Sequence, residues 1–430
     1  MSKQPRGWER STLGEIGVYL NGRGFKKSEW SDIGRPIIRI QNLTGSSESF
    51  NYYDGEADDR HTVRDGDLLV SWAATLGVYL WSGPDAVLNQ HIFKVESHVH
   101  LPFHRYLLAN ALADLQRHTH GSGMVHITKG RFDATPVSVP PTREQERIVA
   151  AIEEHLSRLD ATVAVTDSAT RRLRVLEKLI ITEASSTLAP SADWRAVTVG
   201  DAGSVSLGLQ RSPKRHSGPS MRPYLRVANV FEDRISGDVM SMDMTDAEWK
   251  RFRLRDGDVL LNEGQSPEYL GRPAIYRGEP PDVAFTNSLI RFQANEDVDP
   301  EWALLVFRSH MHNRRFMRES QITTNIAHLA AGRFKTVEFP LPPLDEQRAR
   351  VADARKGLEA CARLRIEITR AKKRSAALRR SILAAAFAGK LVPQDPDDEP
   401  ASALLARIRA AREAEPPVRR ARRGVRGSVS

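Results

Sequence analysis

Apolar side chains recur at alternating steps of three and four residues along two long stretches of the chain, with charged residues between them. This spacing is typical of a coiled-coil seam. Each stretch follows a Pro-Pro pair, and proline suits the first turn of a helix but not its interior. The seam positions are Val149, Ile152, Leu156, Leu159, Val163, Thr166, Thr170, Leu173 and Leu176, then Val351, Ala354, Leu358, Cys361, Leu364, Ile368, Ala371, Ser375, Leu378, Ile382 and Ala385. We expect two helices that pair with each other, although a stripe packed on its own globular domain would show the same pattern.

The segments outside these helices form an internal repeat. Three sequence motifs return in the same order, and the offset grows from 187 to 202 residues, so the second copy carries 15 additional residues. Asp-Gly turns that lead into apolar strands predict sheets in both copies. The matched segments are 35–43 with 222–230, 63–72 with 254–263, and the Gly-Arg-Phe motifs 130–132 with 332–334. This pattern indicates a duplicated domain.

The order of segments predicts an α+β fold with two globular mixed α/β domains in pseudo-two-fold repeat, separated by two long antiparallel coiled-coil helices. Helices of about 45 residues would be roughly 65 Å long. The second globular domain would then be held at a fixed distance from the first. The expected boundaries are 1–142 for the first domain, 143–189 for the central helix, 190–343 for the second domain, 344–391 for the C-terminal helix and 392–430 for a disordered basic tail.

Composition narrows the class of partner. The chain has 430 residues and a formal net charge of +9, which favours a polyanion such as nucleic acid. Its single cysteine, Cys361, excludes an intramolecular disulfide and a thiolate-rich zinc site. The sequence shows neither an apolar run of about 20 residues nor an export signal, so we expect a cytoplasmic protein.

The sequence lacks the motifs that enzymes of this size use. It contains no phosphate-binding loop, no glycine-rich nucleotide fingerprint and no Asn/Asp-Pro-Pro-aromatic tetrapeptide. Histidines cluster near residues 98–104 and 118–120, but carboxylates at ligand spacing do not accompany them. We therefore expect no catalytic residue, no metal and no cofactor.

The duplicated pattern resembles type I restriction-modification specificity (S) subunits over nearly the whole chain. The most specific pieces are residues 140–145 and 342–347, Pro-Pro-x-x-Glu-Gln, and the segment from Ser381 to Gln394. The resemblance implies two target-recognition domains that each read one half of a bipartite site in double-stranded DNA. It also implies helices that dock two methyltransferase (M) subunits, which restriction/translocase (R) subunits join. Methylation and cleavage would then belong to the partners.

Candidate DNA contacts are basic and amide side chains in loops at equivalent places of the two copies, because Arg and Lys reach phosphates or guanine while Asn and Gln pair with adenine. The first choice is the pair of loops 21–27 and 210–216, and the second is segment 126–131 with its counterpart around Asn325, His328 and Arg333. The candidates are Arg23, Lys26, Lys27, His126, Thr128, Lys129, Arg131, Arg211, Lys214, Arg215, Asn325, His328 and Arg333. Since the two sets of loops differ, we expect a split, non-palindromic target.

Other features concern the helices and the C-terminus. We expect Arg171, Arg172, Arg379 and Arg380 to contribute to subunit docking on the outer helix faces. The tail past Gln394 departs from the family's usual ending and contains an arginine-rich end. The alternative interpretation is a coiled-coil scaffold whose basic domains bind RNA and which has no role in restriction, but an aromatic content of 7% gives little support for RNA stacking.

Overall fold

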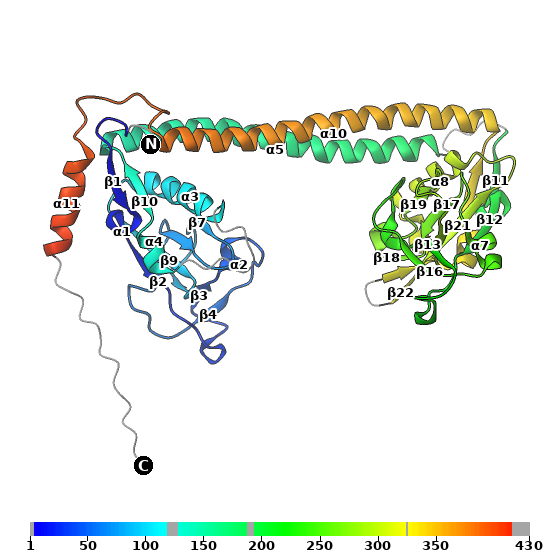
Figure 1. The fold of residues 1–430 in the computed structure, drawn as a ribbon, viewed down its shortest axis with the longest axis horizontal. Helices are drawn as coiled ribbons and strands as arrows, with labels where there is room; N and C mark the ends of the chain where they lie inside the picture. The colour runs from blue at the N-terminus through cyan, green and yellow to red at the C-terminus, as the bar shows by residue number, and fades with distance from the viewer. Residues whose placement is uncertain (1–3, 118–127, 187–192, 324–325, 415–430) are drawn as a thin grey trace, which may run out of the picture. The chain divides into compact units, whose positions relative to one another are not determined.

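A computed structural model describes residues 4–117, 128–186, 193–323 and 326–414 (Figure 1). The chain divides into two compact units. Unit 1 contains the chain up to Ala164 and from Lys373 onward, and unit 2 contains Val165–Lys372. Each unit holds one mixed α/β domain with part of both long helices, so the predicted fold class is confirmed.

The two long helices are α5 (Thr142–Ala184) and α10 (Leu344–Phe387). In unit 2, Lys372 pairs with Asp167 at 2.6 Å and Arg365 pairs with Glu177. In unit 1, Arg379 pairs with Asp160. The residue number falls along one helix as it rises along the other, so the helices are antiparallel within each unit.

The apolar stripes of these helices contact both the partner helix and a globular domain. Ile152 and Leu156 of α5 and Ile382 of α10 are buried in one core together with residues of the first domain. Both interpretations of the stripe are therefore correct, since the same helix face packs on a helix and on a domain. Four predicted seam positions are more than a third exposed, namely Val163, Leu176, Leu364 and Leu378.

The domain of unit 1 contains two four-stranded sheets and one two-stranded sheet among its described residues. The first has the order β2-β9-β6-β7, formed by Gly17–Asn21, Ile92–Ser97, Leu68–Ser71 and Gly77–Leu80. The second has the order β4-β3-β8-β5, formed by Asn51–Tyr53, Arg35–Ile38, Ala86–Leu88 and Thr62–Val63. Strand β1 (Glu9–Thr12) pairs with β10 (Pro136–Val139). The helices are α1 (Leu13–Ile16), α2 (Ile40–Leu43), α3 (Leu101–Arg117) and α4 (Lys129–Asp133), with a 3₁₀ turn η1 (Lys27–Glu29).

The domain of unit 2 repeats this frame. Its sheets include β12-β21-β17-β19, formed by Gly203–Leu207, Leu289–Ala294, Val259–Asn262 and Pro273–Ile275. Another has the order β16-β13-β20, formed by Met240–Asp243, Met221–Leu225 and Ala284–Phe285. Strand β11 (Arg195–Thr198) pairs with β24 (Glu338–Leu341). Short strands β14 (Val230–Phe231) and β15 (Arg234–Ile235) pair, as do β18 (Gly264–Gln265), β23 (Ile326–His328) and β22 (Gln321–Thr323).

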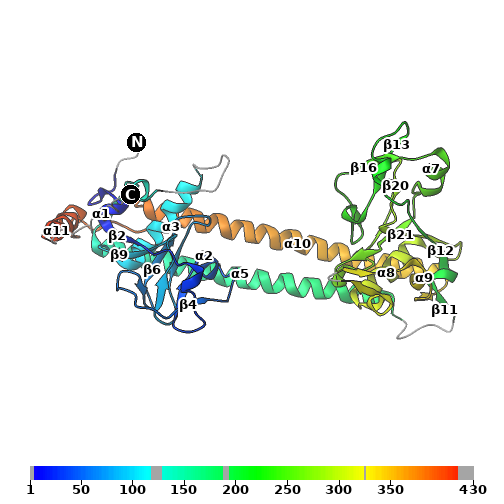
Figure 2. The same cartoon turned by 90° about the horizontal axis from the view of Figure 1, so that it is seen from below.

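The helices of unit 2 follow the same order along the chain as several helices of unit 1. They are α6 (Val199–Ala202), α7 (Asp246–Phe252), α8 (Pro300–His312) and α9 (Ala331–Lys335), with 3₁₀ turns η2 (Pro213–Arg215), η3 (Val227–Asn229), η4 (Pro267–Tyr269) and η5 (Arg315–Glu319). Figure 2 shows β13, β16, β20 and α7 gathered together, apart from α8 and α9. In both units a parallel strand pair occurs at the same place in the second sheet, β3 with β8 and β13 with β20.

The Glu-Gln motif that opens each long helix has a structural role. The fully buried Gln145 accepts a hydrogen bond from the backbone N of His100, just before α3, at 3.0 Å and donates to Pro140 O at 2.9 Å. Gln347 does the same with the backbone N of Asp299, just before α8, and with Pro342 O, both at 2.8 Å. Each glutamine thereby ties the start of a long helix to its own domain, because buried polar groups need partners.

The chain past Gln394 contradicts the expectation of a disordered tail from residue 392. Residues 401–414 form helix α11 (Ala401–Ala414), which contacts α1 (Figure 1). Ala401, Leu405 and Ile408 are buried in the core of unit 1. Net charge suggested disorder, but this segment places an apolar residue at three- and four-residue steps and so buries one helix face. The arginine-rich end beyond residue 414 lies outside the described residues.

Among the described residues, every helix is too short or too polar to cross a bilayer.

Candidate nucleic-acid interface

A short turn joins the two main sheets in each domain. In unit 1 it is residues 89–91, between β8 and β9, and in unit 2 it is residues 286–288, between β20 and β21. Since the strand before the turn belongs to one sheet and the strand after it to the other, each turn marks the line where the sheets meet. We call this turn, with the chain segments bonded to it, the strand junction.

Backbone hydrogen bonds fasten the segments to the junction of unit 1. Asn89 N donates to Ile38 O at 3.1 Å, at the end of β3. Arg23 N donates to Leu88 O at 2.9 Å, and Trp72 N donates to His91 O at 3.3 Å. Three loops from distant parts of the sequence therefore leave the sheets at one place.

The junction of unit 2 has the same construction. Thr286 N donates to Leu225 O at 3.1 Å, Asn287 N to Leu209 O at 3.1 Å and Glu263 N to Ser288 O at 3.0 Å. In each unit a glycine allows the close approach of the first loop. A Cβ on Gly22 would lie 2.2 Å from Asn89 O, and one on Gly208 would lie 2.4 Å from Phe285 O.

The candidate residues of loop 21–27 surround the junction of unit 1. The Arg23 guanidinium lies 4.4 Å from the ring centre of Phe25 and 4.7 Å from that of Tyr53, and it pairs with Glu29. Lys26 and Lys27 are exposed at the turn η1. Arg23 is therefore held in place by rings and a carboxylate, whereas the two lysines extend into solvent.

Helix α4 also reaches this junction. Trp72 stacks on Phe93 and meets the His91 ring edge-on, both at 5.6 Å between ring centres. Lys129 Nζ lies 5.8 Å from the Phe93 ring centre and pairs with Asp133 at 2.7 Å. The neighbouring candidates Thr128 and Arg131 are exposed. His126 lies outside the described residues.

In unit 2 the candidates are distributed differently. His328 Nδ1 lies 3.3 Å from Glu263 Oε2, which places it at the junction. Arg211 lies over the Tyr224 ring at 5.8 Å. Arg333 is exposed and donates to Glu319 O at 3.3 Å, and Lys214 is exposed in η2. Asn325 lies outside the described residues.

The guanidinium of Arg215 is held by hydrogen bonds within the protein. It donates to both carboxylate oxygens of Glu248, at 2.7 and 3.0 Å, and to Asp243 O at 3.2 Å. The hydrogen bond from Arg215 is the largest of the effects that lower the pKa of Glu248 to about 2. A bidentate pair of this kind holds the side chain to α7 rather than leaving it free for DNA.

The junctions also contain polar residues that sequence reasoning missed. Gln90 and Asn287 are exposed at the turns themselves, while Arg39 and Arg226 directly follow β3 and β13. The repeat R-P-x-x-R contained a signal for these arginines, because it placed both at one offset of 187 residues. Amide side chains can pair with adenine, and a carboxylate such as Glu263 can accept from cytosine.

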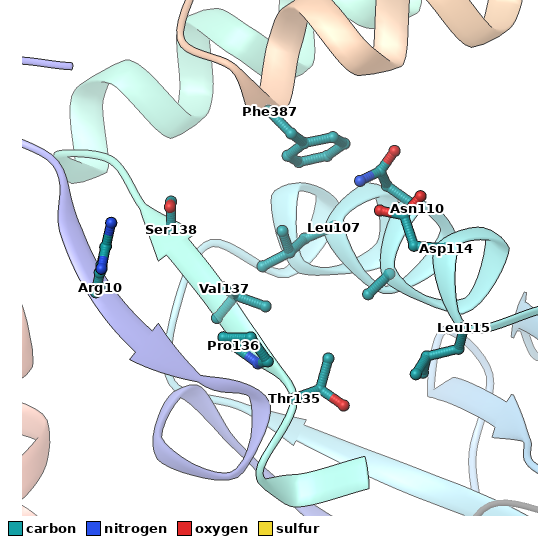
Figure 3. A pocket seen from close by; sticks show the side chains of 11 residues that line it. Arg10, Leu107, Asn110, Asp114, Leu115, Thr135, Pro136, Val137, Ser138 and Phe387 are labelled. Atoms are coloured by element: carbon teal, nitrogen blue, oxygen red, sulfur yellow. The ribbon is translucent and has the colours of Figure 1, made fainter. Parts of the chain in front are cut away.

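A hollow of about 590 Å³ lies elsewhere in unit 1, between α3, β10 and Phe387 of α10 (Figure 3). Leu107, Val137 and Phe387 contribute apolar walls, and Asp114 is its one lining carboxylate. The lining residues include neither histidine nor cysteine. They offer no nucleophile activated by a neighbouring base, which acyl-transfer chemistry would require.

The described histidines of the predicted cluster lie in separate packing environments. The described residues contain no group of three or more metal-ligating side chains. His104 is fully buried and lies between Tyr19 Oη, 2.8 Å from its Nε2, and Ser97 Oγ, 2.7 Å from its Nδ1. Burial of the ring lowers the pKa of His104 to about 3. His118 and His120 lie outside the described residues.

The proposed docking arginines differ in availability. Arg171 and Arg172 of α5 are exposed, as is Arg380 of α10. Arg379 is also exposed, but it pairs with Asp160 of α5 and so helps to hold the two helices together.

Comparison with known proteins agrees with this architecture. Residues 5–168 match the family model of the type I restriction modification DNA specificity domain. The chain is 23% identical to the type I restriction enzyme EcoBI specificity subunit of Escherichia coli, over 95% of this chain and 93% of that protein. It is 22% identical to the EcoKI specificity subunit of Escherichia coli strain K12, over 96% and 97% of the two chains.

Solved structures share the fold. A chain from a study of complex assembly and conformational transition of the type I R-M system aligns with a TM-score of 0.73 at 17% identity, covering 91% of this chain and 100% of that chain. The HsdS subunit from Thermoanaerobacter tengcongensis aligns with a TM-score of 0.51 at 19% identity, covering 90% and 98%.

Proposed function

Because this chain belongs to the family of type I restriction-modification specificity subunits, we propose that it reads double-stranded DNA through the strand junctions of its two domains. The observation that carries this proposal is the duplicated junction. Each one brings basic and amide side chains from separate loops to one place, and these are the groups that contact phosphates and base edges. The alternative of an RNA-binding scaffold has no support from the comparisons.

The two junctions share a backbone but differ in side chains. Trp72 N and Glu263 N each donate to the last residue of the turn, His91 O and Ser288 O. Arg23 N donates to Leu88 O in unit 1, and Leu209 N makes the equivalent bond to Phe285 O in unit 2, so an arginine in one junction corresponds to a leucine in the other. Different donor and acceptor patterns recognise different bases. The target is therefore bipartite and non-palindromic, since identical reading domains would be needed for identical half-sites.

The chain itself acts by recognition, and its partners supply the chemistry. We assign methyl transfer to two methyltransferase subunits, and DNA cleavage to restriction/translocase subunits that join them. The helices offer a docking surface in unit 2, where Val165, Val175 and Ile366 are 68%, 58% and 53% exposed. Exposed apolar side chains among charged ones support the proposal of a protein interface on these helices. Arg171 and Arg172 lie on α5 between the two valines.

The test is to coexpress the chain with the methyltransferase of its own system and map methylated adenines across the host genome. We expect one split sequence whose halves differ. A palindromic target, or methylation that does not depend on this chain, would refute the proposal. The purified chain alone should transfer no methyl group from S-adenosylmethionine to the mapped target.

A further inference from the structure

The repeated segment R-P-x-x-R contains two arginines in each copy, and they have different surroundings. The first arginine has an acceptor within the protein for a terminal guanidinium nitrogen, although the Nε of Arg222 is buried without a partner. Arg35 donates to Gly55 O at 3.1 Å, and Arg222 pairs with Asp246 at 3.1 Å and lies 5.2 Å from the Trp249 ring centre. Arg35 holds the second sheet of unit 1 to the loop at Gly55, and Arg222 holds the equivalent sheet of unit 2 to α7.

The second arginine is not satisfied. Among the described residues, no carboxylate or carbonyl oxygen accepts a hydrogen bond from the guanidinium of Arg39 or of Arg226, and the Nε of each is buried without a partner. Arg39 additionally lies 5.6 Å from the ring centre of Trp30. A buried donor without an acceptor is costly and uncommon in proteins. Several other arginines, Arg222 among them, also have a buried Nε without a partner. Arg39 and Arg226 differ from Arg222 because their terminal nitrogens lack an acceptor in the described part of the chain as well, at the same position of both copies, which points to an acceptor that is not part of the chain.

An asparagine fixes the backbone of each of these arginines. Asn42 Oδ1 accepts from Arg39 N, and Asn229 Oδ1 accepts from Arg226 N, both at 3.1 Å. The amide nitrogen of each asparagine donates to two backbone carbonyls of the following loop. These are Ser47 O and Ser49 O in the first copy and Ser236 O and Asp238 O in the second. The arginine is therefore presented from a rigid turn, which limits the entropy lost when it binds a ligand.

The position of the arginine in the fold is also the same. Ile38 O and Leu225 O accept the bonds that fasten the turns of the two strand junctions, and the unsatisfied arginine is the next residue in each case. Both arginines are partly exposed, so an external group can reach the guanidinium.

We propose that Arg39 and Arg226 each bind a phosphate of the DNA backbone, at equivalent places in the two half-sites. This inference rests on the proposed DNA-reading function and adds which residues set the position of each domain on the duplex. A feature that is identical in two domains cannot select different bases. It suits the phosphate group, which is the same at every position of DNA and accepts two parallel hydrogen bonds from a guanidinium.

The experiment uses the full complex with its methyltransferase and a duplex that contains the mapped target. Arg39→Ala, Arg226→Ala and the double variant are compared with Arg60→Ala and Arg318→Ala, which remove an exposed arginine from each domain. Each single variant should weaken binding about tenfold and reduce the slope of log affinity against log salt by about 0.9. The double variant should show both effects added. The methylated sequence should not change, and the controls should match the unaltered complex.

Two further measurements separate the possible outcomes. Since neither guanidinium has an acceptor within the chain, the alanine variants should melt at the temperature of the unaltered complex or above it. Arg39→Lys should restore the salt slope, because it restores the charge. An unchanged slope in both alanine variants, or a changed base at one half-site, would overturn the inference while the proposed function stands. If the unaltered complex shows no preference for the mapped target, the proposed function itself fails.

Discussion

Arg147 and Asp398 are 251 residues apart in the sequence and form a two-point ion pair, with distances of 2.5 Å and 3.3 Å. The Asp398 side chain is 2% exposed and that of Arg147 is 34% exposed. The hydrogen bond that Arg147 donates to the Asp398 carboxylate raises the pKa of Arg147. This pair lies where the chain leaves α10 and before α11 begins, so it anchors the C-terminal segment to the first turns of α5.

We expect Asp398→Asn to loosen α11 from unit 1, because it leaves a guanidinium beside a neutral amide. The expected cost is about 1–3 kcal/mol. Hydrogen exchange should show faster exchange for residues 401–414 and little change in the second domain. Glu399→Gln is the control, since Glu399 forms a solvent-exposed pair with Arg407, and exposed pairs contribute little to stability. Unchanged protection of α11 in Asp398→Asn would show that its buried apolar face and its own contacts with Glu15 and Gly17 are enough to hold the helix.

His104 makes the stability of unit 1 depend on pH. Its folded-state pKa of about 3 lies below the ordinary value of about 6.5, so the unfolded chain binds the additional proton as the pH falls below 6.5. The stability is therefore full above pH 6.5 and decreases towards pH 3, by about 2 kcal/mol at pH 5. His104→Gln should flatten this decrease in urea unfolding measured at pH 7 and pH 5. His155→Gln, at an exposed site on α5, should leave it as it is. An equal decrease in both variants would assign the pH dependence to other groups.

Charge reversal on the exposed face of α5 should weaken assembly with the methyltransferase. Arg171→Glu with Arg172→Glu places two negative charges beside the exposed valines without touching the buried seam. We expect a loss of affinity of tenfold or more, measured by titration of the methyltransferase. Lys250→Glu with Arg251→Glu makes the same change of charge on α7 and should assemble normally. If the two double variants assemble equally well, the docking surface lies elsewhere.

The length of the paired helices should set the gap between the half-sites. One heptad inserted after Ala169, with another after Arg370, keeps the seam in phase, because Asp167 pairs with Lys372 nearby. Seven residues add about 10 Å of helix, close to three base-pair steps of about 3.4 Å. Mapping of methylated adenines should return the same two half-sites with about three more base pairs between them. Half-sites that change their sequence would contradict this role of the helices.

The sequence alone was sufficient for the duplicated frame, the two long helices and the family. These features rest on covalent repetition and on local periodicity, which can be read without knowing distant contacts. The repeat also contained Arg39 and Arg226, but nothing local distinguished them from Arg35 and Arg222. The same limit applied to Arg215, a candidate contact whose ion pair with Glu248 spans 33 residues.

Only the tertiary structure decided which of these cations are free and where the C-terminal segment goes. An arginine is most readily available to DNA when no carboxylate or carbonyl accepts its hydrogen bonds, and many of those neighbours come from elements that are distant in sequence. The fate of the C-terminal segment follows the same reasoning. The charged residues past Gln394 predicted disorder from residue 392. Leu405 and Ile408 are nevertheless buried, because α1 and the start of α5 form an apolar core against which they pack. Periodicity along the chain determines an element, whereas the contacts that satisfy or free its side chains arise when distant segments meet.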